Sequence, residues 1–247
     1  MRYQSRMIAV VFTIVCTAGA IDAQMPEKPE NLQVLPKDMP REALIQRMRE
    51  FSFALGVRCQ YCHAGGDGVS FEGVVFKSDE KPAKQKARAM LKLVDTLNRS
   101  LLPAIPARRD PPVQVDCVTC HRGQSVPRTL ASDLTDVIRT KGIEAAVQRY
   151  RELREKTLLR GLYAFDEWTM NELARKLTEE GNTQAAVAML ELNGEYYPKS
   201  ADIDFALGQL HETRGERDKA IARYKSVLAK APDHVRARQR LEALEKK

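Results

Sequence analysis

Two five-residue stretches constrain this chain more than any other part of it. They are Cys-Gln-Tyr-Cys-His at 59–63 and Cys-Val-Thr-Cys-His at 117–121. Both match C-x-x-C-H, the attachment pattern for c-type haem. Two thiols on one turn can each add across a vinyl group of the same macrocycle, and the adjacent histidine can bind the iron from one face. The pattern predicts two covalently bound haem c groups, held by Cys59, Cys62, His63, Cys117, Cys120 and His121.

Zinc and disulfides are the alternatives for these cysteines. Four thiolates suit a structural zinc site, but the gap between Cys62 and Cys117 is far longer than zinc-ribbon spacing allows. Disulfides are common in exported chains. Neither alternative explains why a histidine follows both pairs, so haem is favoured.

The N-terminus resembles a secretory signal peptide. Arg2 and Arg6 precede an apolar run at 7–20, and Ala18-Gly19-Ala20 fits a cleavage site, with Ala23 as a second option. We expect residues 1–23 to be removed and the protein to be periplasmic. An uncleaved membrane anchor is the alternative, although the run is short for a membrane span. Cleavage would remove one of the five cysteines and leave only the four in the motifs.

Composition is that of an ordinary globular protein. The 247 residues are 43% hydrophobic and 30% charged, with a net charge of +7. Basic residues are interleaved with acidic ones rather than gathered in a stripe with aromatic residues, so nucleic acid is not an expected partner. The expected partners are redox proteins.

A helix from Asp38 to Leu55 is expected before the first motif, with Gly56 ending it. Its apolar stripe, at steps of four, three and four, consists of Leu44, Met48, Phe51 and Leu55. Because the first motif follows at once, this face should cover the first haem. The Met48 sulfur could bind the iron or could simply pack in the core.

A second helix is expected to begin near Pro82 and to carry a stripe of Ala83, Ala87, Met90, Val94, Leu97 and Leu101. A glycine-rich loop at 64–77 should precede it and pass the haem edge. A proline-rich link follows, in which Arg108 and Arg109 could contact haem propionates. Small Ala83 and Ala87 would let a flat macrocycle approach the helix.

The stretch from Asn31 to Pro127 resembles the cytochrome c subunits of photosynthetic reaction centres. The resemblance is carried by Met-Arg-Glu-Phe-Ser-Phe-Ala-Leu-Gly-Val-Arg-Cys at 48–59, Ala-Arg-Ala-Met at 87–90 and residues 117–123. In that family a helix precedes each motif and usually supplies a methionine as sixth ligand. The resemblance implies His63 with Met48 for the first haem and His121 with Met90 for the second.

This chain departs from the family pattern in its number of haem motifs. The family subunit carries four haems, whereas two motifs are present here. One family haem takes a histidine from the other half of the subunit. For the second haem the candidate sixth ligands are therefore Met90, His211 and His234, or the position is open.

The C-terminal half, 130–247, resembles tetratricopeptide repeats. Gly181 and Gly215 are separated by thirty-four residues, and so are three further pairs: Ala186 with Ala220, Leu190 with Tyr224, and Pro198 with Pro232. Two helix pairs are expected at 167–200 and 201–234, with a degenerate pair at 133–155 and a capping helix at 235–245. Trp168, Tyr196, Tyr197 and His211 are expected to pack between helices, and His234 to be solvated or to cap a helix.

These patterns predict a mainly α chain with a dihaem cytochrome c domain at 24–129 and a tetratricopeptide-like helical solenoid at 130–247. The leading hypothesis is a dihaem protein that transfers single electrons and is not an enzyme. A peroxidase-like enzyme with one open haem is a second hypothesis. The third is an interaction protein that docks partners through its repeats and whose haems sense redox state.

Overall fold

The computed structural model describes residue 26, residues 28–106 and residues 111–246. The chain divides into two compact units, unit 1 (Met1–Ser125) and unit 2 (Val126–Lys247). The expected domain limits at 24–129 and 130–247 stay predictions. The expected signal peptide at 1–23 lies outside the described residues, as do Arg108 and Arg109.

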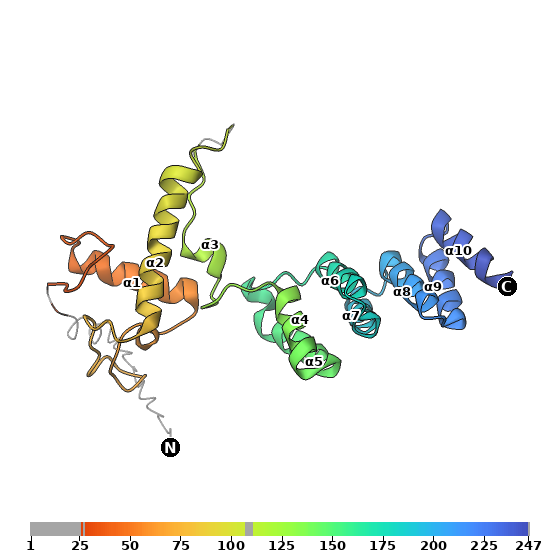
Figure 1. Cartoon of the computed structure of the whole chain (residues 1–247), viewed down its shortest axis with the longest axis horizontal. Helices are drawn as coiled ribbons and strands as arrows, with labels where there is room; N and C mark the ends of the chain where they lie inside the picture. Colours follow the sequence, from red (N-terminus) through yellow and green to blue (C-terminus); the bar gives the residue numbers. More distant parts are fainter. Residues whose placement is uncertain (1–25, 27, 107–110, 247) are drawn as a thin grey trace, which may run out of the picture. The chain divides into compact units, whose positions relative to one another are not determined.

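Unit 1 is built from short helices joined by long loops. Its α-helices are α1 (Arg41–Leu55), α2 (Pro82–Thr96) and α3 (Cys117–His121), with a 3₁₀ turn η2 (Cys59–Tyr61) and a π-helical turn η3 (Leu97–Leu101). In the described part of the chain the only β pairing is an isolated bridge between Ala64 and Val75. Figure 1 shows α2 crossing α1, with α3 at the end of the long link that follows α2.

The end of α1 lies against Gly123, two residues after the second motif. Gly56 caps the helix in the left-handed conformation (φ 65°), and the Gly123 amide donates a hydrogen bond to the Ala54 carbonyl at 2.8 Å. A Cβ on Gly56 would lie 2.1 Å from the Gly123 carbonyl oxygen. Gly56 was expected only to end the helix. In the structure it also allows α1 and the second motif to meet.

The helix before the second motif is shorter than its apolar stripe predicted. Regular α2 ends at Thr96 and continues as the π turn η3, where the Leu102 amide donates to the Leu97 carbonyl at 2.8 Å. The Asn98 side chain donates to the Val115 carbonyl at 2.7 Å and accepts from the Val115 amide at 2.8 Å. These two hydrogen bonds hold the segment that precedes the second motif against the turn that follows α2.

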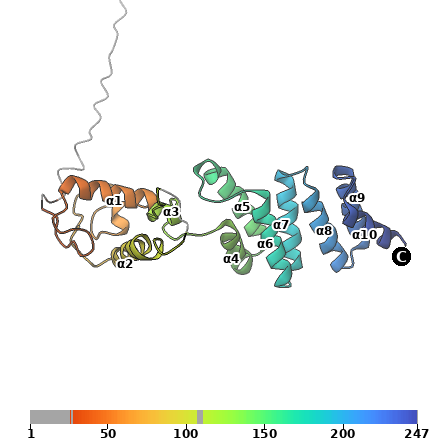
Figure 2. The same ribbon diagram turned by 90° about the horizontal axis from the view of Figure 1, so that it is seen from above.

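Unit 2 is a series of antiparallel helix pairs (Figure 2). The helices are α4 (Leu130–Lys141), α5 (Ile143–Thr157), α6 (Glu167–Glu179), α7 (Thr183–Tyr196), α8 (Ala201–Thr213), α9 (Arg217–Lys230) and the final α10 (Val235–Glu245). The α8–α9 crossing is close, because a Cβ on Gly208 would lie 2.6 Å from the Tyr224 ring. The mainly α fold and the repeated helix pairs are confirmed.

Three side chains of unit 2 bear on the packing predictions: one is exposed against expectation, and two histidines have clear structural roles. Trp168 is 74% exposed, so its predicted place between helices is wrong. It lies in the first turn of α6, outside the buried stripe. His211 is buried and its Nδ1 lies 2.6 Å from a Glu216 carboxylate oxygen. His234 caps α10 by accepting the Ala237 amide at 3.1 Å.

Within the described ranges, every helix is too short or too polar to span a bilayer.

Replacing Gly56 by alanine should open the contact between α1 and the second motif. We expect a loss of more than ~3 kcal/mol in local stability, because the methyl group meets a backbone carbonyl and the residue keeps a positive φ. The matched control is Gly68→Ala, where φ is +83° and a Cβ meets nothing within 4 Å. That variant should lose only ~1–2 kcal/mol. Hydrogen exchange at α1 amides measures both, and equal losses would contradict the contact.

Candidate functional site

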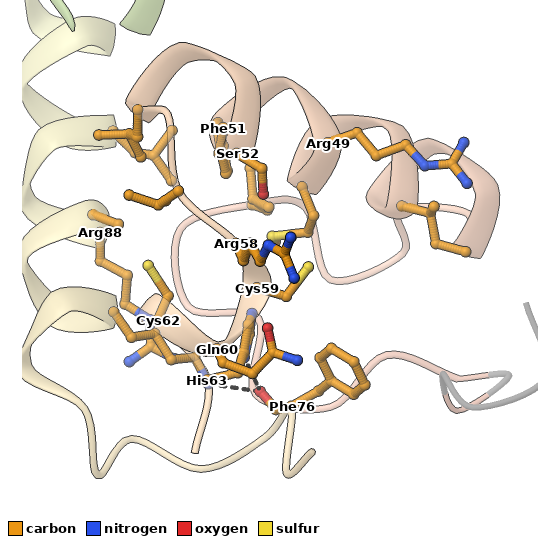
Figure 3. Close-up of a pocket in the computed structure, with 18 of the residues that line it drawn as sticks. Arg49, Phe51, Ser52, Arg58, Cys59, Gln60, Cys62, His63, Phe76 and Arg88 are labelled. Atoms are coloured by element: carbon orange, nitrogen blue, oxygen red, sulfur yellow. Dashed lines mark hydrogen bonds between the residues drawn. The ribbon is translucent and has the colours of Figure 1, made fainter. Parts of the chain in front are cut away.

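The first motif folds as a tight turn that gathers its three chemical groups. The amides of Cys62 and His63 both donate to the Cys59 carbonyl, at 3.1 and 3.0 Å. Arg58 precedes the turn in an extended conformation, so the chain leaves α1 and reaches the motif within three residues. Cys59, Cys62 and His63 are brought together against α1 (Figure 3).

A cavity of about 460 Å³ adjoins this turn, a volume within the range of ligand and cofactor pockets. Its walls come from four segments: the lead-in at 31–35, α1, the motif with its following loop, and α2. Most of the lining side chains are apolar. They include Leu32, Val34, Leu35, Ile45, Met48, Phe51, Leu55, Val57, Val69, Phe71, Phe76, Ala87 and Leu91.

A backbone carbonyl selects the tautomer of His63. Its Nδ1 lies 3.2 Å from the Phe76 carbonyl oxygen, which can only accept, so Nδ1 carries the proton (Figure 3). Nε2 is then the nitrogen with a lone pair for a metal. Burial, helped by the charge of Lys84, lowers the pKa of His63 and favours the neutral ring that binds metals.

The same environment acts on the cysteine thiols. Burial raises the pKa of Cys62, and the neighbouring Cys59 adds to the increase. Cys62 is therefore held as a neutral thiol at neutral pH.

Met48 lies on the face of α1 that lines this cavity, together with Ile45, Ser52 and Leu55. It is half-buried there. The structure therefore brings Met48, His63, Cys59 and Cys62 to one cavity, which is the set predicted for the first haem. Its role as sixth ligand stays a prediction.

The face of α2 that lines the first cavity shares only Ala87 with the predicted apolar stripe. The cavity is lined by Lys84, Ala87, Arg88 and Leu91. Met90 is not among the lining residues and is 41% exposed. It therefore lies on a different face of α2 from the first cavity, and its role toward the second haem stays a prediction.

The lead-in closes one side of the cavity as a hydrogen-bonded strap, residues 31–35. Asn31, with a positive φ of 63°, donates its side-chain amide to the Lys77 carbonyl at 2.6 Å and to Asp79 at 2.9 Å. Arg88 donates to the Asn31 carbonyl at 3.1 Å and pairs with Asp79 at 2.9 Å. Asp79 thus connects the strap to α2.

The second motif is a short capped helix. The Asp116 side chain accepts the Thr119 amide at 3.0 Å, and the Thr119 hydroxyl accepts the Asp116 amide at 3.1 Å. His121 is 8% exposed, and its Nδ1 lies 2.7 Å from the Gln124 carbonyl oxygen. As at the first motif, a carbonyl acceptor leaves Nε2 with the lone pair.

The thiol of Cys117 in the second motif also titrates above its ordinary range. Burial raises the pKa of Cys117, and the Asp116 carboxylate adds to the increase. Cys120 is exposed.

The zinc and disulfide alternatives gain no support from this geometry. Among the described residues, no group of three or more His, Cys, Asp or Glu side chains gathers where it could hold one metal ion. The four described cysteines are free thiols. His211 and His234 belong to unit 2, where His211 contacts Glu216 and His234 caps α10.

Sequence reasoning missed the strap and the two cations of α2 that border the cavity. Hydrophobic periodicity finds apolar stripes, whereas Lys84 and Arg88 reach the cavity wall through aliphatic stems. Lys84 and Arg88 are four residues apart with Ala87 between them. This spacing could have predicted the two cations at the cavity, because it places both beside the small residue expected to face a macrocycle.

Acid should release the strap. Hydrogen bonds from Arg88, Asn31 and Lys84 hold the pKa of Asp79 well below its usual range. The stabilising carboxylate is therefore fully present above the ordinary aspartate pKa of about 3.9 and is lost as pH falls toward the folded value. We expect the protection of the amides at 31–35, taken relative to their intrinsic exchange rates at each pH, to fall below about pH 4. Asp79→Asn should show fast exchange already at neutral pH, and the same variant exchanging slowly would contradict the role of Asp79.

Comparison with known proteins covers both units. Residues 27–165, more than half of the chain, match the family model for the photosynthetic reaction centre cytochrome c subunit. Residues 177–244 match a tetratricopeptide repeat model. The first match continues through α4 and α5, beyond the Asn31–Pro127 stretch that carried the resemblance in the sequence.

Two curated relatives match the same region. Cytochrome c-554 of Chloroflexus aurantiacus is 36% identical over 104 residues, which cover 42% of this chain and 23% of the relative. The photosynthetic reaction center cytochrome c subunit of Roseobacter denitrificans is 31% identical over 102 residues, which cover 41% of this chain and 26% of the relative. The chain thus spans about a quarter of the length of these relatives. It belongs to the family of photosynthetic reaction centre cytochrome c subunits, with tetratricopeptide repeats following the cytochrome part.

Proposed function

We propose that this protein is a dihaem c-type cytochrome that carries single electrons between redox partners. The observation that carries the proposal is the first cavity, where the two thiols, His63 and Met48 of one predicted site line a single apolar space. The relatives named as cytochromes support it. Haem c, when bound, supplies a one-electron couple at its iron.

The residues present fit such a group. The paired thiols lie on one turn, the cavity is largely apolar, and each motif histidine has Nδ1 bonded to a carbonyl. We propose Cys59, Cys62, His63 and Met48 for the first haem, and Cys117, Cys120, His121 and Met90 for the second. The cations Lys84 and Arg88 on the cavity wall suit anionic propionates.

We also propose export to the periplasm through residues 1–23, and docking of a redox partner on the repeats of unit 2. With both irons blocked by methionine, the protein would not be an enzyme. An open second haem would instead favour peroxidase-like chemistry. The partial exposure of Met90 is the observation that favours this second candidate function.

Haem content tests the two attachment sites separately. The full chain is expressed with haem-ligating machinery, purified, and analysed by pyridine haemochrome and intact mass. We expect two haems in the wild type, and one in each of the double variants Cys59→Ser with Cys62→Ser and Cys117→Ser with Cys120→Ser. A colourless wild type, or one containing zinc, would overturn the proposal.

Methionine ligation is tested by the Met-to-iron charge-transfer band of the oxidised protein. Met48→Ala and Met90→Ala should each remove about half of its intensity, since each removes one sulfur ligand. Met39→Ala is the matched control, because Met39 precedes α1 and does not line the cavity. An unchanged band in Met90→Ala, together with carbon monoxide binding to the reduced wild type, would favour the open-haem enzyme.

A further inference from the structure

The Phe76 carbonyl is shared by two donors. It accepts His63 Nδ1 at 3.2 Å and Lys84 Nζ at 2.8 Å. The carbonyl that orients the predicted iron ligand is therefore also bound by a cation. Lys84 comes from α2, whereas His63 directly precedes the glycine-rich loop at 64–77 and Phe76 lies near the end of that loop.

Lys84 is fixed at this position by three acceptors. Its Nζ donates to the carbonyls of Phe76 and Ser78, both at 2.8 Å, and lies 3.3 Å from a carboxylate oxygen of Asp79. An ammonium group has three protons and no acceptor lone pair, so three oxygen partners match the charged form. Its side chain is 13% exposed, which leaves little room for another rotamer.

Because Lys84 also donates to the Phe76 carbonyl, the hydrogen bond from His63 Nδ1 to that carbonyl is weaker. A carbonyl already bound to a cation is a poorer acceptor for a second donor, so less negative charge builds up on the His63 ring. A ring that donates less electron density to iron stabilises the oxidised state less. Asp79 pairs with both Lys84 and Arg88, so its single carboxylate offsets part of the long-range field of the two cations. The short contact to the carbonyl is not offset.

We propose that Lys84 is a positioning residue that raises the reduction potential of the haem at the first motif, acting through the Phe76 carbonyl on His63. The inference rests on the proposed function, because it requires His63 to bind iron. It adds a residue outside both motifs that changes the difference in reduction potential between the two haems.

Potentiometric titration of the holoprotein tests this, with the second haem as an internal reference. In Lys84→Met the equilibrium constant for reduction of the first haem should fall about three- to tenfold, tenfold being 59 mV for one electron. The matched control is Lys81→Met, because Lys81 donates to the Gln60 carbonyl inside the same motif and not to Phe76. This control should change the constant less than about twofold.

A second readout separates tuning from a general disturbance. In the oxidised protein, the hyperfine-shifted Nδ1 proton of His63 should move in Lys84→Met, where it gains a stronger acceptor, and not in Lys81→Met. If Lys84→Met takes up haem poorly, Lys84→Gln provides a neutral donor of similar polarity and should show the same sign of shift.

The outcomes distinguish the two proposals. A wild type without haem at the first motif overturns the proposed function. Haem present at that motif, with Lys84→Met equal to wild type or to Lys81→Met in potential, overturns the inference and leaves the proposed function intact. A fall confined to the first haem, with the His63 proton shifted, supports both.

Discussion

The arrangement of unit 1 depends on a backbone contact between two glycines. Gly56 ends α1, Gly123 follows the second motif, and the Gly123 amide bonds to α1 at Ala54. Because neither residue has a side chain, the backbone at the end of α1 directly contacts the backbone that follows the second motif. Motifs separated by more than fifty residues in the sequence thereby belong to one small unit.

Local chemistry in the sequence predicted most of the helices. Gly56 ends α1 and Pro82 begins α2, as their local backbone preferences predicted. The thirty-four-residue spacing of Gly181 and Gly215 predicted repeated helix pairs, and these are present. Long-range polar contacts were not predictable in this way. The bond from Asn31 to Asp79 spans forty-eight residues, and no periodic pattern reports it.

The incorrect predictions have two physical causes, one at a helix end and one on helix faces. The start at Asp38 was placed too early, because Pro40 is the N-cap rather than part of the helix. Trp168 was assigned to the core on size, although its position in α6 faces away from the buried stripe. On α2 the prediction named only an apolar stripe, and it did not include Lys84 and Arg88, which line the first cavity. Aromatic and charged side chains are amphipathic, so composition alone does not determine which face they occupy.

The carbonyls that bind His63 and His121 have a consequence for maturation. Both belong to segments downstream of their motif, Phe76 thirteen residues after His63 and Gln124 three residues after His121, so the chain selects the metal-binding tautomer without help from another molecule. Ligand rings that are preorganised in this way lose little rotational entropy when iron arrives. If haem c is attached at both motifs, reorientation of these two rings would add little to the cost of assembly.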